Sequence, residues 1–370
     1  MHKVTFFPTG NADACFIELQ NARRIMFDFA DQKDRSDRDD KRCDLESELR
    51  KRLGSNKKVD VLAISHLDAD HFQRVSEVFW LEHAAKYQSD DRIKIDTLWV
   101  PVAAIIEEGI TDEGRVLRSE ARYRLEQGDG IRVFGRATLL DAWLRDRGIN
   151  PANRRSLITD AGQLAPEFSL AIDGVEFFVH SPFASRDKDG NLVDRNGSAL
   201  FMQAKFEIEG ASTRLILSAD CPYEPLEAII AATKKHGNDE RLEWDINNIP
   251  HHCSYLSLSD EKGDDETEPG EEIDWLYSTQ GASRSFLVST SKPIPTGGDD
   301  TQPPHRQAAN YYRRIAREHG GEFRITMEHP SAGSPKPMEF EIDRYGARLL
   351  KPVMAPVVAA VSSRPRAGVR

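Results

Sequence analysis

The chain has 370 residues, enough for one large domain or two ordinary ones, and its hydrophobic (39%) and charged (30%) fractions exclude global disorder. Its net charge of -11 argues against nonspecific coating of nucleic acid, but not against an enzyme that binds a polyanion in one cleft. No run approaches the roughly 18 apolar residues of a membrane span, and the N-terminus is unlike a secretory signal. Four widely spaced cysteines form neither a disulfide framework nor a thiolate zinc site. We therefore expect a cytoplasmic protein without a membrane partner.

The first 65 residues combine short strands with one helix. Apolar or alternating runs separated by turn residues predict strands at 3–7, 14–19 and 23–29. A charged stretch then predicts a solvated loop, and residues 45–55 predict a short helix that ends near Gly54. Residues 59–65 have the apolar, β-branched content of a strand buried on both faces.

The segment from about 75 to 165 is expected to be a helical insertion over the core. Residues 72–87 carry Val75, Val78, Phe79 and Ala85 at helical spacing. The stretch "IDTLWVPV" predicts a further strand, and "RATLLDAWLRDRG" predicts a helix.

The C-terminal half returns to a regular order of strands and helices. Strands are predicted at 174–183, 198–210, 213–221, 245–250, 283–290, 323–327 and 338–343, and the short link between the second and third of these predicts a hairpin. Helices are predicted at 225–237 and 304–321, each followed by glycine. An acidic run at 259–274 predicts a flexible surface loop, and 351–370 a flexible tail.

This order of elements predicts an α/β fold. Strands precede helices in each half, which fits two mixed β-sheets packed face to face with helices outside, an αββα sandwich. We expect residues 1–350 to form this single domain.

The segment "ISHLDADHFQ" places four potential metal-ligand side chains within six residues. His66, Asp68, Asp70 and His71 follow directly on a predicted strand. Alternate residues of an extended loop point the same way, so the first three side chains can converge while His71 approaches from the side. Imidazole and carboxylate are ordinary ligands of zinc, manganese and iron, so we predict a metal-binding loop.

Two later strand ends supply further candidate ligands. Asp220 ends the apolar run "LILSADC", where a buried carboxylate is costly unless it is paired or coordinated. His251 and His252 follow the strand at 245–250. The alternatives are that Asp220 caps the helix beginning at Pro222 and that the two histidines are structural.

These motifs resemble the metallo-β-lactamase fold hydrolases, and most closely the branch typified by the hydrolase domain of the competence protein ComEC. That branch has a strand ending in S-H-x-D-x-D-H, a later strand ending in G-D and an H-H-G-S segment, which are similar to "SHLDADH" (65–71), "SAD" (218–220) and "HHCS" (251–254). Asp13 in "PTGNADACFIEL" and Asp28 in "IMFDFA" match further aspartates of the branch, and "NGSALFMQAKF" is similar to its N-x-S-L-V-L strand. The resemblance spans residues 3–350 and implies the metallo-β-lactamase αββα fold.

Several positions depart from that pattern. Ala219 and Cys253 replace glycines, and Asp68 stands where the antibiotic-degrading relatives have histidine. The histidine that those relatives contribute between the ligand loop and the bridging aspartate has no clear counterpart, and the candidates for it are His180, Asp194 and Asn196.

A two-metal arrangement assigns a role to each candidate residue. His66 and Asp68 would bind one divalent ion, Asp70, His71 and His251 the other, and Asp220 would bridge them. Asp70 would also orient the attacking water or accept its proton, while His252 and Ser254 would donate to the substrate. The carboxylate-rich ligand set suits Mn²⁺ as well as Zn²⁺.

The resulting prediction is a metal-dependent hydrolase, most consistent with a phosphodiesterase or nuclease acting on nucleic acid, a nucleotide or another small anionic substrate. Hydrolysis of an ester, thioester or lactone is the first alternative, and a metal-binding regulatory module the second. Cys15, Cys221 and Cys253 lie beside the site residues in sequence; they are either buried hydrophobic side chains or a redox-sensitive set.

Overall fold

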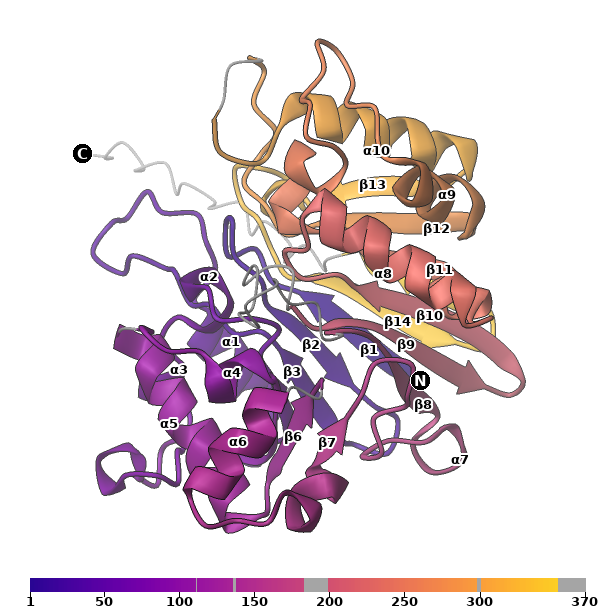
Figure 1. The fold of residues 1–370 in the computed structure, drawn as a ribbon. Coiled ribbons are helices and arrows are strands. Elements are labelled where there is room, and N and C mark those ends of the chain that lie inside the picture. The colour runs from indigo at the N-terminus through magenta and orange to yellow at the C-terminus, as the bar shows by residue number, and fades with distance from the viewer. Residues whose placement is uncertain (111, 136–137, 183–198, 298–300, 352–370) are drawn as a thin grey trace, which may run out of the picture.

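A computed structural model describes residues 1–110, 112–135, 138–182, 199–297 and 301–351. Within these residues, two mixed β-sheets pack face to face and helices cover the outer face of each sheet (Figure 1). The predicted αββα sandwich is therefore confirmed. None of the described helices is long and apolar enough to cross a membrane.

The first sheet has nine strands in the order β15-β14-β1-β2-β3-β4-β5-β6-β7. Strands β3 to β7 are parallel to one another, whereas the remaining pairs are antiparallel. The bounds are β1 (His2–Phe6), β2 (Cys15–Glu18), β3 (Arg24–Phe27), β4 (Lys58–Ala63), β5 (Lys94–Pro101), β6 (Ile131–Phe134), β7 (Ile158–Thr159), β14 (Met338–Asp343) and β15 (Gly346–Leu349). Because β14 pairs with β1, the end of the chain completes the sheet that its beginning starts.

The second sheet has six strands in the order β13-β12-β11-β10-β9-β8. Strands β8 to β10 are antiparallel, and β10 to β13 are parallel. The bounds are β8 (Val175–Ser181), β9 (Phe201–Ile208), β10 (Ala211–Leu217), β11 (Trp244–Asn248), β12 (Gly281–Ser289) and β13 (Glu322–Ile325). Ile208 pairs with Ala211 across a tight turn, as expected for the predicted β9–β10 hairpin.

The helices form the two outer layers. The first sheet is covered mainly by α1 (Leu45–Leu53), α2 (Ala69–Phe72), α3 (Val75–Val78), α4 (Ala103–Ile106), α5 (Asp112–Gln127) and α6 (Thr138–Asp146). The second sheet is covered by α8 (Tyr223–Lys235), α9 (Glu271–Thr279) and α10 (Arg306–Glu318), and the short α7 (Leu170–Asp173) precedes β8.

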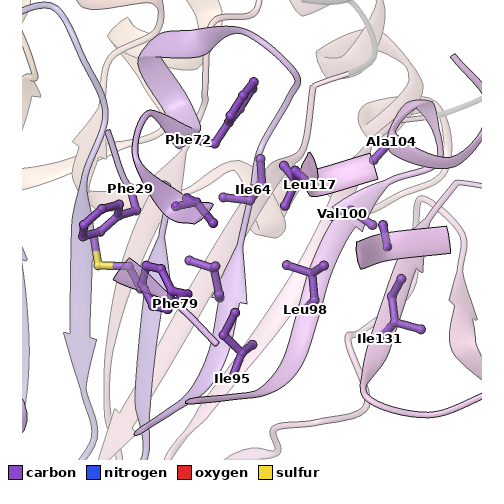
Figure 2. Packing of buried hydrophobic residues seen from close by; sticks show 14 of the residues in the cluster. Phe29, Ile64, Phe72, Phe79, Ile95, Leu98, Val100, Ala104, Leu117 and Ile131 are labelled. Atoms are coloured by element: carbon purple, nitrogen blue, oxygen red, sulfur yellow. The ribbon is translucent and has the colours of Figure 1, made fainter. Parts of the chain in front are cut away.

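Strand β4 shows how the apolar layers arise. Its neighbouring side chains alternate: Leu62 packs in the outer layer of the first sheet, whereas Val61 and Ala63 pack between the sheets. Figure 2 shows the outer layer, where Phe72 and Leu117 of the helices lie over Ile64 and Leu98. This strand is therefore buried on both faces, as its composition predicts.

The predicted helix at 72–87 is wrong. The chain forms the one-turn helices α2 and α3, separated by Arg74 in a left-handed conformation (φ 69°). Phe79 then forms an isolated parallel bridge with Ile93. The helical spacing of apolar residues is real, but Phe72, Val78 and Phe79 reach the outer core from separate turns.

The segment from 75 to 165 is more than a helical layer. It contains helices α3 to α6, but it also adds β5, β6 and β7 to the first sheet. Parallel strands joined by helices bury both faces of the added sheet, which a purely helical insertion would not do.

The acidic run at 259–274 is in contact with the body of the domain. Arg306 and Asn310 of α10 donate to the carbonyls of Asp264 and Asp265, and Arg314 pairs with Glu266 at 2.8 Å. The last residues of the run already belong to α9, which begins at Glu271. Of the predicted tail, residues 352–370 lie outside the described residues.

Candidate metal centre

Turns at the carboxyl ends of three strands carry the candidate ligands. Strand β4 ends at Ala63, β10 at Leu217 and β11 at Asn248, and each is followed within a few residues by histidine or aspartate. Although β4 and β10 belong to different sheets, His71 Nε2 lies 3.5 Å from Asp220 Oδ1. The sandwich therefore brings these turns to one shared edge.

Four residues form a compact cluster at this edge. Asp70, His71, Asp220 and His252 each place one ligand atom within 4.8 Å of the others. His71 Nε2 is 3.8 Å from Asp70 Oδ1, and His252 Nε2 is 3.4 Å from Asp70 Oδ2 and 3.5 Å from Asp220 Oδ2. Two imidazole nitrogens and two carboxylates are a donor set that zinc or manganese accepts.

The unpaired atoms of this cluster fit a cation. Nε2 of His71 and His252 and Oδ1 of Asp220 are buried, and none has a hydrogen-bond partner among the described residues. The same holds for Nε2 of His66, which lies beside the cluster. A buried polar atom without a partner costs about 1–3 kcal/mol, so several of them facing one point are unfavourable unless a cation binds there. The residues present therefore could hold a divalent metal ion.

Electrostatics favours positive charge in the same place. Burial would lower the pKa of His252, but Asp220, Asp70 and Asp13 together outweigh burial and raise that pKa to about 9. Burial is likewise outweighed at His71, where Asp220 and Asp28 raise the pKa. At His66 burial dominates and lowers the pKa to about 3, so this imidazole is neutral. A metal ion would displace the protons that His71 and His252 otherwise carry.

Both histidines of the cluster are oriented by acceptors behind them. His71 Nδ1 donates to Asp28 Oδ2 at 2.8 Å, and His252 Nδ1 donates to the carbonyl of Thr290 at 2.8 Å. Ser65 fixes the position of Asp28, since its amide and hydroxyl both donate to the Asp28 carboxylate, at 2.7 and 2.6 Å. Such acceptors leave each Nε2 facing the cluster, which is how proteins usually prepare a histidine ligand.

His66 and Asp68 lie beside the cluster rather than within it. The His66 ring is 3.8 Å from the His71 ring between centroids, and His66 Nε2 is 3.7 Å from Asp68 Oδ2. The Asp68 side chain is 38% exposed, whereas the His66 side chain is buried.

The structure gives the two neighbouring histidines different places from those expected. His252, expected as a proton donor, is in the cluster, whereas His251 Nε2 is 3.9 Å from Asp220 Oδ2 and its side chain is 25% exposed. Ser254, also expected to donate to substrate, is fully buried, and its Oγ accepts a hydrogen bond from the amide of Leu256. Its hydroxyl therefore caps the turn that follows.

The backbone that carries these ligands is unusual. His251, His252 and Cys253 are consecutive residues with φ of 50°, 53° and 67°, and Ala219 has φ of 49°. The two turns are joined, because the amide of His251 donates to the carbonyl of Ala219 at 3.2 Å. This region of φ favours glycine, so Ala219 and Cys253 adopt a conformation that costs energy for a residue with a side chain.

Of the three candidates for a further ligand, only His180 lies within the described residues, and both of its ring nitrogens contact residues outside the cluster. His180 on β8 contacts Thr233 Oγ1 through Nδ1 and the carbonyl of Arg241 through Nε2, both at 3.0 Å. Burial lowers its pKa to about 3, so it is a neutral histidine of the interior. Asp194 and Asn196 lie outside the described residues.

Asp28 matches an aspartate of the family that the sequence resembles, but no role was assigned to it, and Thr290 was not singled out. Asp28 follows β3 as the ligands follow β4, and this position at a strand end was the available signal. For Thr290 no such signal exists, because the atom that contacts His252 is a backbone carbonyl.

No protein-family model matches the chain, and no curated protein matches it. Among solved structures, unliganded yeast PDE1 aligns with 88% of this chain and 96% of its own, at 10% identity and a TM-score of 0.45. Zinc-bound PqqB from Methylobacterium extorquens aligns with 87% of this chain and 97% of its own, at 10% identity and a TM-score of 0.34. These scores are too low to support a conclusion about function.

Proposed function

We propose that the chain is a metal-dependent hydrolase that cleaves phosphodiesters, with nucleic acid or a nucleotide as the substrate class. The observation that carries the proposal is the convergence of Asp70, His71, Asp220 and His252, with unpaired buried nitrogens, at one edge of the sandwich. The order of the motifs, which is similar to that of the ComEC-type hydrolase domain, supports it.

The residues divide into ligands and groups that meet substrate. Asp70, His71, Asp220 and His252 would hold one ion, and His66 and Asp68 would contribute to a second, each ion being Zn²⁺ or Mn²⁺. When bound, the ions would supply Lewis acidity and lower the pKa of water toward neutrality. Three carboxylates against two dications leave a net positive charge, which suits an anionic phosphate.

The partly exposed side chains would act on the substrate. The Asp70 carboxylate is 33% exposed and could accept the proton of the attacking water. His251 lies at the rim, and its Nε2 could donate to a phosphate oxygen or to the leaving group. We therefore assign to His251 the donor role that the sequence suggested for His252.

The test combines elemental analysis with a substrate panel. Purified protein should contain zinc or manganese and hydrolyse bis-p-nitrophenyl phosphate, with single-stranded DNA and RNA as further substrates. His71→Ala should lose the metal and reduce turnover by at least about 100-fold, because it removes a ligand. The exposed His236 at the end of α8 provides a matched control, and His236→Ala should retain both properties.

Other results of this experiment would support one of the two alternative functions or refute the proposal. Cleavage of lactones or thioesters without phosphodiester cleavage would make the protein an ester-type hydrolase of the same site. Bound metal without turnover on any of these substrates would favour a regulatory module. Protein that binds neither metal would refute the proposal.

A further inference from the structure

One loop of the first sheet reaches across to the second sheet beside the metal centre. The loop between β1 and β2 (residues 7–14) carries Asn11, whose side chain accepts from the amide of Lys292 at 2.9 Å and donates to the carbonyl of Pro303 at 2.6 Å. Both partners follow β12 of the second sheet. The loop thus joins two sheets whose strands are not hydrogen-bonded to each other.

Asp13 of this loop contacts the ligand turn directly. Its amide donates to the carbonyl of Asp70 at 3.0 Å, and its Oδ2 lies 3.7 Å from His71 Nδ1. Asp13 therefore touches two consecutive residues of the proposed ligand set through contacts that do not use their ligand atoms.

Thr290 completes the connection from the other side. Its hydroxyl donates to Asp13 Oδ1, and its carbonyl accepts from His252 Nδ1 at 2.8 Å. Thr290 and Asp13 are 1% and 6% exposed, so water does not compete for these bonds. A single residue after β12 is thereby linked to His252 on one side and, through Asp13, to Asp70 and His71 on the other.

We propose that Thr290 is a positioning residue of the metal centre, which through Asp13 and His252 holds the ligands of the two sheets at binding distance. This inference rests on the metal-binding part of the proposed function. Thr290 would belong to the residues that hydrogen-bond to metal ligands without binding the metal. Loss of such a residue commonly lowers metal affinity by about 10- to 100-fold. Valine has nearly the shape of threonine, so Thr290→Val removes the hydroxyl while the backbone carbonyl that orients His252 remains.

The experiment measures metal affinity in the full chain. Zinc is removed by chelation, zinc affinity is measured by competition with a chromophoric chelator, and the absorption spectrum of the cobalt(II)-substituted protein reports ligand geometry. Thr290→Val should bind zinc about 10- to 100-fold more weakly and change the cobalt spectrum. Thr290→Ser, which restores the hydroxyl, should return to within about threefold of the wild type.

Ser289 offers a matched control. Its buried hydroxyl bonds to Ser291 at 2.7 Å, and Ser289→Ala should leave zinc affinity unchanged. Equal zinc affinity in Thr290→Val and the wild type, or equal losses in Thr290→Val and Ser289→Ala, would overturn the inference. If Thr290→Val does not fold, Asp13→Ala, which removes the acceptor of the Thr290 hydroxyl, tests the same link, and wild-type affinity there would also overturn it. Wild-type protein that binds no metal would instead defeat the proposed function.

Discussion

His251 and His252 are neighbours in the chain with different surroundings. His252 is buried with its Nε2 in the cluster, whereas His251 is partly exposed at the rim. The left-handed turn that carries them is what separates their directions. Such a conformation costs a non-glycine residue about 1–2 kcal/mol, and strain of this kind is typical of functional sites.

The cysteines beside the site are buried residues of the interior. Burial raises the pKa of Cys15 and of Cys253, and Cys221 is also fully buried. A thiol that is protonated and inaccessible is a poor nucleophile, so the structure favours a packing role over a redox role.

We expect the folded protein to resist thiol reagents and peroxide. In native protein, a chromogenic disulfide should label at most the half-buried Cys43, whereas the unfolded chain should react at all four cysteines. Activity and bound metal should survive mild peroxide. Inactivation by peroxide that a thiol reverses would contradict this prediction and restore the redox interpretation.

At the scale of elements, helix α5 is attached to its surroundings through Glu120 and Arg124, which form a buried ion pair within the helix and also bond to residues outside it. Glu120 accepts from Arg124 Nε at 2.6 Å, from the ring of His83 at 2.9 Å and from the amides of Glu82 and His83 at 3.0 Å. Arg124 in turn donates to the carbonyl of Gly130, just before β6, at 2.8 Å. This network fixes the helix beside β5, which the sequence predicts, and β6, which it does not.

Removing Glu120 should be costly. Glu120→Ala leaves the buried guanidinium of Arg124 with only the half-exposed Glu82, at 3.8 Å, as a charged partner. We expect a loss of about 3–5 kcal/mol in the free energy of unfolding, measured with urea. Glu108 is the control, because it pairs with Arg118 and Arg122 but is 75% exposed. Glu108→Ala should cost less than about 1 kcal/mol. Equal losses in the two variants would show that the buried pair does not hold the helix.

The same carboxylate should contribute to acid sensitivity. Burial would raise the pKa of Glu120, but the bond from His83 and the charge of Arg124 lower it from 4.5 to about 2. Because the folded pKa lies below the unfolded value, this stabilisation is complete above pH 4.5 and is lost as the pH falls toward 2. Urea unfolding at several acidic pH values should therefore show a shallower decline in Glu120→Gln than in the wild type.

At the scale of the whole molecule, the candidate metal centre draws its residues from both sheets. Asp70 and His71 follow a strand of the first sheet, and Asp220 and His252 follow strands of the second. An ion held by all four would favour the packed sandwich over any state in which the sheets separate, because it binds only when both are in place.

Metal should accordingly raise thermal stability. At a free concentration 100-fold above Kd, a bound ion adds about 2.7 kcal/mol, so Zn²⁺ or Mn²⁺ should raise Tm and a chelator should reverse the change. His71→Ala should show a much smaller shift. An unchanged Tm in wild-type protein that demonstrably contains metal would indicate that the unfolded chain binds the ion equally well.

The sequence by itself determined the local parts of this protein. Period-two alternation and apolar runs located most strands, and the position of "HLDADH", Asp220 and the histidine pair at strand ends pointed to ligand turns. These features depend only on residues that are close together in the sequence, so the sequence is enough to predict them. Strands β6 and β7 are short and gave little periodicity, and the apolar spacing at 72–87 does not reveal the turn at Arg74.

Only the tertiary structure decided which side chains meet. The cluster contains His252 rather than His251, and Asp28 accepts from His71. His180 contacts Thr233 instead of the cluster, and Thr290 is linked to His252. All of these contacts join residues that are distant in sequence. Each depends on the direction of a side chain after two sheets have packed. The local sequence pattern does not predict that direction, because packing depends on the sum of contacts across the whole sandwich.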